Sequence, residues 1–387
     1  MRWIFPDPND REETAAREAV RGRIDAWWKA FTKTRLQIDA LFSGRNDFDL
    51  VDFMGRTLQS IDQSLAWEFG PALNGSGHRL AICPEAEHHL HPMTDDLLAR
   101  APKLKDFEFY HGRPPEDVEG AKDSVEARVG ADIRKGSVRI DIGEMNRIDV
   151  SYFFPQIKDA DQARNAAFIT SESLFGERCM DSWAGVIEAW PRPEGDGWMP
   201  LESAAEAMKQ AIDAVQESLP DGPWSSWINN SDWTALSMKA DADREPDPHR
   251  FGDLITATVS HTEFMMGILR GTLFHSPRYS RHGEKFCYLK LDETEFQDNS
   301  RFDFRRPAED SLDQELQAKS LGCIIGGGTG VWFGYCLLAL TDVKKAIPVI
   351  RKVLREHKAH TNSWLLFLDY DWCAEWVGIW DDTPPPP

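Results

Sequence analysis

Histidine side chains are densest in one short stretch of the chain, residues 83–91, which read CPEAEHHLH. His88, His89 and His91 lie there beside two glutamates, and imidazole with carboxylate is a donor set that suits zinc or nickel. His89 and His91 share a face only in an extended strand, whereas this stretch precedes a predicted helix and has no HExxH motif. Two interpretations follow: a metal site at these three histidines, or solvated histidines in a loop.

Other residues that could do chemistry form no recognised catalytic signature. Nucleophilic catalysis needs a serine or cysteine on a sharp turn with a histidine base, and neither GxSxG nor a known cysteine motif occurs. The carboxylate pairs Asp141 with Glu144 and Asp369 with Asp371 can act as acid and base if they are buried. Asp369 and Asp371 converge if they lie on a strand, where residues i and i+2 share a face. A solvated strand face is the alternative.

A basic stretch, HSPRYSRHGEKF at residues 275–286, interrupts the otherwise acidic sequence. It can bind a phosphate or an acidic partner. The competing interpretation, which we expect, is an exposed loop before a strand.

Residues 321–332, LGCIIGGGTGVW, place four glycines between two apolar runs. A P-loop requires GxxxxGK followed by Ser or Thr, and a dinucleotide fingerprint requires a helix after GxGxxG. Here no lysine follows, and the apolar run predicts a strand. We therefore expect a tight turn or bulge between paired strands, with glycines that supply positive φ. A small anion nest or a docking edge at this turn is the alternative.

The apolar periodicity predicts the elements that hold these residues. Residues 11–42 carry apolar side chains at helical spacing with charges between them, which indicates one amphipathic helix or two. The strands LAWEFGP and HRLAICP flank an NGSG turn and predict a hairpin. Helices and strands then alternate up to residue 219. This pattern predicts an α+β sandwich with helices on one face of a mainly antiparallel sheet.

The length of 387 residues predicts two domains, because a single core rarely grows that large. Residues 220–251 are rich in Pro, Asp, Ser and Asn, and we expect a linker or packed loop between domains at 1–219 and 252–380. After a short helix, the second domain has the order β-α-β-β-α-β of a ferredoxin-like fold. Residues 381–387 end in prolines and are expected to be a disordered tail.

The charge balance limits the classes of partner. The chain has 64 acidic and 44 basic side chains, a formal net charge of −20. This charge repels nucleic acid and anionic membranes, and it either serves solubility or suits a basic protein partner. Six cysteines without a CxxC pair predict reduced thiols. With no secretory-type start and no apolar run of membrane-spanning length, we expect a cytoplasmic protein that carries no cofactor.

Residues 65–115 contain a distinctive series of segments. An aromatic-Glu-Phe-Gly-Pro strand, a glycine turn, an Arg-Leu-x-Ile strand and a helix precede Ala-Pro and an aromatic strand with a following arginine. With the Leu-Phe-Gly-Glu step at 174–177, this series resembles the bacterial family known as domain of unknown function 695, over about residues 25–193. The chain departs from it at CPEAEHHLHP, where that family has a Ser-Ala-Asp-Gly type of turn.

The resemblance implies no activity, but it directs attention to Glu68, Arg79, Arg113 and Glu177. These polar residues lie in strand or turn contexts, and structural salt bridges are their alternative role. The second half is similar at the level of fold to small ferredoxin-like domains with a Gly-Gly-Gly-Thr-Gly turn, as in the ribonuclease E inhibitor family. That likeness favours a protein-binding regulator, although a fold alone does not fix a function.

These observations predict a non-enzymatic protein that binds another protein, as a regulator or as an immunity-type neutraliser of a toxin. Trp224 and Trp332 are candidate contacts, because aromatic side chains rimmed by acid suit a basic partner. The alternative is a metal-binding or small-ligand-binding protein, or a hydrolase, with a pocket between the two domains. Whether the protein is a monomer or a homodimer paired through a sheet edge stays open.

Overall fold

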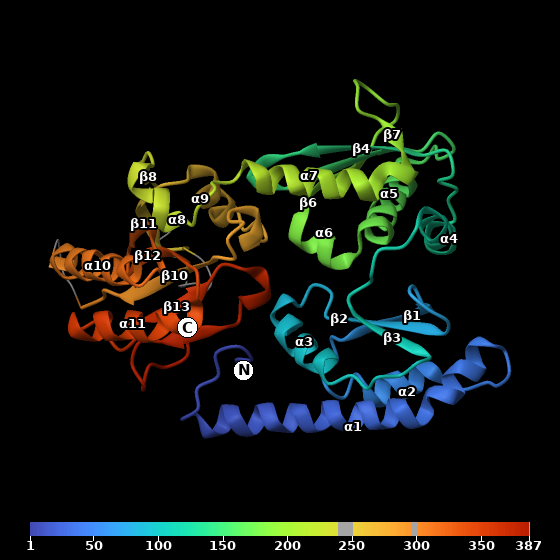
Figure 1. Ribbon diagram of the computed structural model, residues 1–387, viewed down its shortest axis with the longest axis horizontal. Helices are drawn as coiled ribbons and strands as arrows, with labels where there is room; N and C mark the ends of the chain where they lie inside the picture. Colours follow the sequence, from blue (N-terminus) through green and yellow to red (C-terminus); the bar gives the residue numbers. More distant parts are fainter. Residues whose placement is uncertain (239–250, 296–299, 387) are drawn as a thin grey trace. The chain divides into compact units, whose positions relative to one another are not determined.

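The computed structural model describes residues 1–238, 251–295 and 300–386, and it contains helices and several sheets (Figure 1). The predicted α+β class is therefore correct. The chain divides into two compact units: Met1–Gly143 with Arg147–Ile212, and Glu144–Asn146 with Asp213–Pro387. We call them unit 1 and unit 2. Among the described residues, no helix has the length and apolar character that crossing a bilayer requires.

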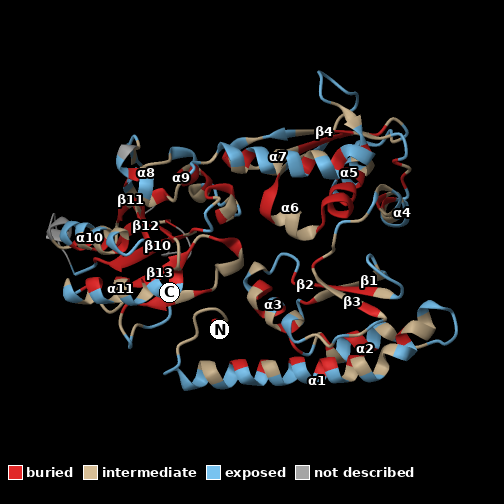
Figure 2. Ribbon diagram, in the orientation of Figure 1, coloured by how far each residue is buried: buried red, intermediate tan, exposed pale blue. Residues whose placement is uncertain are grey.

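Unit 1 begins with a single long helix, α1 (Arg11–Phe42). Its first turn is capped by Asp10, whose side chain accepts a hydrogen bond from the amide of Glu13. The buried residues of α1 recur at helical spacing and lie along one side of the helix (Figure 2). They pack with strand residues in one core, where the rings of Phe31 and Phe107 meet edge to face at 5.1 Å.

The core of α1 is completed by a three-stranded sheet in the order β1-β2-β3. The predicted hairpin is confirmed, since β1 and β2 are antiparallel, whereas β2 and β3 are parallel. Parallel neighbours need a crossover, which a helix between them supplies. The elements are α2 (Leu50–Thr57), β1 (Ala66–Pro71), β2 (His78–Cys83), α3 (His91–Ala99) and β3 (Phe107–His111).

A second sheet of unit 1 has the order β6-β5-β4-β7 and also contains a parallel pair, β5 with β6. Unit 1 therefore contains two sheets instead of the one expected, and each of them combines antiparallel pairing with one parallel pair. A helical segment connects the two parallel strands of each sheet, α3 between β2 and β3 and α5 with α6 between β5 and β6. This segment returns the chain to the end of the sheet at which the first strand began. The elements are α4 (Val118–Val129), β4 (Ser137–Ile142), β5 (Ile148–Phe153), α5 (Ala160–Phe175), α6 (Glu177–Trp183), β6 (Ala184–Ala189), β7 (Met199–Pro200) and α7 (Ala204–Ser218), whose last residues belong to unit 2.

Unit 2 contains a seven-stranded sheet in the order β14-β13-β10-β12-β11-β9-β8, with every neighbouring pair antiparallel. The segments β10-α10-β11-β12-α11-β13 follow the predicted β-α-β-β-α-β order, and three strands extend that sheet. The elements are α8 (Trp224–Trp227), β8 (Thr234–Ser237), β9 (Leu254–Val259), α9 (Thr262–Leu269), β10 (Lys285–Asp292), α10 (Ser300–Ala318), β11 (Gly322–Gly330), β12 (Phe333–Leu340), α11 (Val343–Glu356), β13 (Trp364–Phe367) and β14 (Trp376–Gly378).

The glycine run does not form the expected turn, because all of it belongs to strand β11. A bulge does occur near Ile324, but none of the four glycines has a positive φ. Their role is close approach: a Cβ on Gly328 would lie only 2.5 Å from Cδ1 of Leu254. The turn follows at residues 331–332, where the carboxylate of Asp253 accepts the amide of Trp332 at 2.9 Å.

We expected a linker or packed loop at 220–251, an exposed loop at 275–286 and a disordered tail at 381–387, and described residues of all three belong to unit 2. The stretch 220–251 contains α8 and β8, although its residues 239–250 lie outside the described chain. In the basic stretch 275–286, Arg278 is only 2% exposed, so the expectation of an exposed loop is wrong. The C-terminal segment is also held, because the indole Nε1 of Trp364 donates to the carbonyl of Pro384 at 2.7 Å.

Candidate functional site

Two of the three histidines of the predicted metal site come together, because the rings of His88 and His91 stack with their centroids 5.7 Å apart. His88 and His89 belong to a short 3-10 helix, and His91 begins α3, so the extended geometry that the metal hypothesis needs is missing. His89 is half exposed, with Nδ1 3.4 Å from a carboxylate oxygen of Glu87, whereas His91 is buried. Within the described ranges, no three His, Cys, Asp or Glu side chains are placed to hold a metal ion.

Buried His91 instead belongs to a chain of polar side chains in unit 1. Its Nδ1 lies 2.8 Å from Nε2 of His111 and 2.9 Å from Nη1 of Arg178. Because arginine can only donate, this Nδ1 is an acceptor, and His111 must donate to it. The other ring nitrogen of His111 lies 2.6 Å from the carboxylate of Asp95. His111 therefore lies between the imidazole of His91 and the carboxylate of Asp95.

The four residues singled out by the family resemblance come together beside the small sheet of unit 1. The Nε of Arg113 donates to Glu68 at 2.7 Å, and the Arg113 amide donates to Glu177 at 3.0 Å. A guanidinium nitrogen of Arg79 lies 3.7 Å from the second oxygen of Glu68. The sequence therefore selected residues that meet in space.

Additional charges close this cluster. The carboxylate of Glu172 accepts hydrogen bonds from Arg113 and, at 2.7 Å, from Arg128, while Arg79 also pairs with Glu116. Burial lowers the pKa of Arg113, but the Glu172 carboxylate and then Glu68 raise it above its ordinary value. Every carboxylate of this group receives a donor from within it. We call the group the arginine–glutamate network; it comprises Glu68, Arg79, Arg113, Glu116, Arg128, Glu172 and Glu177.

Cys83 ends strand β2 beside this network and is no nucleophile. Its thiol donates to the carboxylate of Glu177, and its sulfur accepts the amide of Glu85 at 2.9 Å. Burial, and then the hydrogen bond to Glu177, raises the pKa of the Cys83 thiol well above its ordinary value. The thiolate that nucleophilic chemistry requires is therefore disfavoured.

The carboxylate pairs suggested by the sequence are separated by their local structure. Asp141 pairs with Arg139 on β4, and Glu144 pairs with Arg270 in unit 2. Asp369 precedes a 3-10 helix instead of lying on a strand, so the argument from strand spacing to Asp371 fails. Buried Asp369 accepts a hydrogen bond from the amide of Ser276 at 2.8 Å. Its carboxylate also forms an ion pair with Lys285 at 3.2 Å. That is the setting of a structural carboxylate.

The two tryptophans chosen as docking contacts are poorly placed for docking. Trp224 is 3% exposed and sits in the core of unit 2, with its indole donating to the Tyr279 carbonyl at 3.0 Å. Trp332 is half buried and packs against the same core. The exposed tryptophan of this region is Trp233, which has 46% of its surface accessible.

A groove opens on the face of the unit 2 sheet where helical cover ends. Helices α10 and α11 contact each other, and Glu309 of α10 lies over Gly327 of β11. A helix is about 10 Å wide and strands are about 4.8 Å apart, so two helices cover about four strands. Strands β9 and β8 therefore extend beyond α10, and Thr256 and Thr258 of β9 are exposed.

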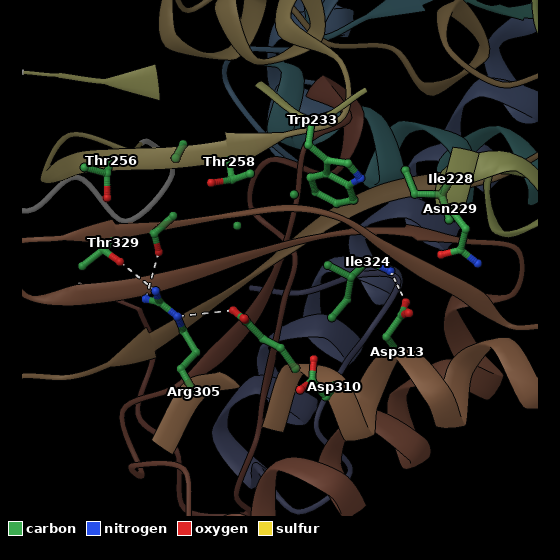
Figure 3. Close-up of a pocket in the computed structure, with 15 residues that line it drawn as sticks. Ile228, Asn229, Trp233, Thr256, Thr258, Arg305, Asp310, Asp313, Ile324 and Thr329 are labelled. Carbon is green, nitrogen blue, oxygen red and sulfur yellow. Dashed lines mark hydrogen bonds and ion pairs between the residues drawn. The ribbon is translucent and has the colours of Figure 1, made fainter. Parts of the chain in front are cut away.

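Gly327 lines this groove. Trp233 lies on one side of it, and Asp310 of α10 lies on the other (Figure 3). Pairing places Gly327, Thr258 and Ala235 in one row across β11, β9 and β8. A Cβ on Gly327 would lie 3.6 Å from the Glu309 carboxylate, so the floor is bare backbone. The groove has a volume of about 380 Å³, which fits one long side chain or a small molecule.

One buried guanidinium organises the charges beside the groove. Arg305 donates to the Gly328 carbonyl at 3.0 Å and to the Thr329 hydroxyl at 2.7 Å. The same guanidinium lies 3.3 Å from an oxygen of buried Glu293 and 3.3 Å from an oxygen of Glu309. Two carboxylates thus contact the same guanidinium group.

The wall formed by α10 adds further acid. Burial raises the pKa of Glu309 to about 7, with Arg305 opposing that rise, and burial also raises the pKa of Asp313. Asp313 accepts the amide of Ile324 at 2.7 Å, whereas Asp310 is exposed at the groove. The groove therefore places three carboxyl groups beside an accessible indole. Such a site favours a cation, which carboxylates attract and an aromatic face also binds.

The sequence analysis missed these groove residues, although one signal was present. Positions 309, 310 and 313 are all acidic, and spacing by three or four residues places Asp310 near Asp313 on a helix surface. Pro307 made this spacing hard to recognise as helical, because an internal proline normally ends a helix. In the structure, α10 continues through Pro307.

A comparison of the chain with protein-family models, curated proteins and solved structures finds no match. The resemblance of residues 25–193 to family 695 therefore stays a prediction.

Proposed function

We propose that this protein is a non-enzymatic binding module whose acidic groove accepts a lysine or arginine side chain from a basic protein partner. The observation that carries the proposal is the excess of carboxylates over cations at an accessible groove. Among the described residues, Glu309, Asp310 and Asp313 line it together with one guanidinium, that of Arg305. The net charge of −20 adds long-range attraction for a basic partner.

The shape of the groove supports a long cationic side chain. The bare backbone at Gly327 leaves room for a methylene stem, and Trp233 offers an indole face on the opposite side from α10. The hydroxyls of Thr256 and Thr258 are exposed on the floor and can accept hydrogen bonds from an ammonium group.

A second candidate function follows from Glu309 alone. A carboxyl group with a pKa of about 7 beside a groove is suited to general acid–base chemistry, which would make the protein a hydrolase or a small-ligand binder. In that case Glu309→Gln would abolish a reaction. In the binding proposal, the same change would only weaken affinity.

Three wider assignments accompany the proposal. Strands β10 to β13 with α10 and α11 support a ferredoxin-like domain extended by β8, β9 and β14. All six cysteines are free, which suits a reducing, cytoplasmic compartment. We further propose that the groove acts within one chain, so that a homodimer is not required.

The binding proposal is tested by calorimetric titration with a synthetic peptide of alternating lysine and serine, at low and at moderate salt. We expect salt-sensitive binding that Asp310→Lys weakens by at least about tenfold and Trp233→Ala by about threefold. Both side chains are exposed, so neither substitution should disturb the fold.

Glu315→Lys is the matched control for Asp310→Lys. Glu315 also lies on α10 and is partly exposed, but it does not line the groove. Its carboxylate pairs with Lys319 instead. Both changes alter the net charge equally. If they weaken binding equally, only the overall charge attracts the peptide and the groove proposal fails.

A further inference from the structure

A crevice in unit 1 gathers positive charge in a chain that is strongly acidic overall. It lies between α1 and the segment from α3 to β3, and its volume is about 520 Å³. Four of its lining side chains are cations: Lys29, Lys33, Arg35 and Arg100. This local excess of cations is unusual in a chain with a formal net charge of −20, and it points to an anionic ligand.

The two lysines supply charge that is available to a ligand. Lys29 and Lys33 are exposed one helical turn apart on α1, where residues i and i+4 are neighbours. Across the described part of the chain, no ion pair joins either lysine to a carboxylate. Their ammonium groups are therefore free to meet an anion at the crevice.

The two arginines are held in place at the rim. Arg35 donates to the Thr32 carbonyl at 2.8 Å and lies 3.4 Å from the carboxylate of Asp106. Arg100 lies 3.0 Å from the carboxylate of Asp25. Both are partly neutralised, so they fix the walls and leave the lysines as the main source of net charge.

The floor of the crevice is apolar and firmly packed. Trp28 is 4% exposed, its indole donates to the Leu97 carbonyl at 2.8 Å, and its ring meets that of Phe109 edge to face at 4.7 Å. Pro102 lines the crevice from the other segment. An apolar floor under a cationic rim suits a ligand with an anionic group and an apolar body.

We propose that this crevice binds the phosphate group of a small phosphorylated molecule, with Lys29 and Lys33 on the phosphate and the apolar part of the ligand over Pro102 and the edge of Trp28. A doubly charged phosphate matches two lysine point charges better than a single carboxylate does. The concave shape concentrates the cations around one compact group, whereas an acidic peptide needs an extended surface. This site is independent of the groove in unit 2.

The test is calorimetric titration of the full chain with phenyl phosphate, benzoate and inorganic phosphate. Phenyl phosphate should bind more tightly than benzoate, which has the same ring but one charge fewer, and more tightly than inorganic phosphate, which lacks the ring. The variant Lys29→Met with Lys33→Met should weaken phenyl phosphate by at least about tenfold. Methionine keeps the side-chain stem and the helix propensity, so the fold should persist.

The control is Lys344→Met with Lys352→Met, which removes two exposed lysines from α11 in unit 2. It should leave the affinity within about twofold of the original, because neither lysine lines the crevice and salt screens exposed charges. Equal losses in both double variants would overturn the proposal. So would benzoate or a glutamate-rich peptide binding as tightly as phenyl phosphate, since the crevice would then recognise carboxylates in general.

Discussion

The arginine–glutamate network of unit 1 and the acidic groove of unit 2 contain the same types of charged side chain, but they differ in how these charges are paired. In the network, Glu172 alone receives two guanidinium groups, from Arg113 and Arg128. Beside the groove, the Arg305 guanidinium lies 3.3 Å from each of two carboxylates, those of Glu293 and Glu309. Each carboxylate of the network has a donor within it, whereas among the described residues no ion pair joins the exposed Asp310 of the groove to a cation. This difference separates a structural cluster from a candidate binding site.

Position in the fold explains this difference. Arg113 follows β3 and Glu172 lies on α5, so the network joins a sheet to a helix of the neighbouring sheet and uses its hydrogen bonds for that purpose. The groove lies where α10 ends its cover of a single sheet. The charges of the groove do not have to join this sheet to another element. They therefore face a space that a ligand can enter.

The largest expected effect comes from breaking the network. Arg113→Met removes the donor to Glu68 and Glu172 but keeps most of the side-chain volume. Because the Glu172 carboxylate, which is only 10% exposed, then keeps Arg128 but loses the Arg113 donor, we expect a loss of about 3 kcal/mol in the free energy of unfolding. Urea denaturation measures this loss.

Arg192→Met is the control for that change, because the Arg192 pair with Glu194 is largely exposed. Surface pairs contribute about 0.5 kcal/mol, so this variant should unfold almost as the original does. Equal losses in the two variants would remove the distinction between a closed network and an ordinary surface pair.

A smaller effect, of about 2 kcal/mol, is expected from the pH dependence of the groove. Burial raises the pKa of Glu309 to about 7 from an ordinary value of 4.5. The folded state therefore binds this proton more strongly than the unfolded state does. The stability from the protonated form is complete below about pH 4.5 and is lost as the pH rises through about 7.

Glu309→Gln removes this titration and keeps the size of the side chain. The free energy of unfolding of the original protein, minus that of the variant, should fall by about 2 kcal/mol between about pH 5 and about pH 8. Taking the difference cancels other groups, such as Asp313, whose pKa is also raised. A difference that stays constant with pH would mean that Glu309 ionises as an ordinary surface glutamate does.

The sequence predicted local elements better than their assembly. The helix at 11–42, the hairpin of β1 and β2 and the β-α-β-β-α-β order of unit 2 follow from periodicity and turn residues, and the structure contains all three. The parallel pairs in unit 1 were missed, because pairing depends on which strands meet across a helix. Local periodicity does not contain that information.

The candidate sites divide in the same way. Glu68, Arg79, Arg113 and Glu177 were selected as polar residues on strands and turns, and they do meet. The groove could not be selected, because it depends on how far α10 reaches across the sheet. Tryptophan shows the same limit: Trp224 and Trp233 look alike in the sequence, but only their packing makes one a core residue and the other an exposed one.

The smallest effect concerns the glycines of β11, which belong to both the core and the groove. A Cβ on Gly328 would lie 2.5 Å from Cδ1 of Leu254 and 2.8 Å from the Thr256 carbonyl, so Gly328→Ala should cost about 1.5 kcal/mol of unfolding free energy. A Cβ on Gly327 points toward Glu309 and has its nearest contact at 3.2 Å, with the Tyr335 carbonyl. Gly327→Ala should therefore change stability by less than about 0.5 kcal/mol, since replacing a strand glycine also stiffens the unfolded chain.

Substitutions at the two glycines should have the opposite order of effect on peptide affinity. Gly327→Val adds methyl groups to the floor of the groove, and it should lower the affinity for the lysine–serine peptide by about fivefold, because the stem of a cationic side chain loses that space. Gly328→Ala fills the opposite, core-facing side of β11 and should leave the peptide affinity of the folded protein unchanged. Adjacent residues of one strand would then affect different properties, stability for Gly328 and binding for Gly327. If Gly327→Val binds the peptide as tightly as the original protein does, the ligand does not reach the floor, and Trp233 with the exposed edge of α10 would have to form the whole contact.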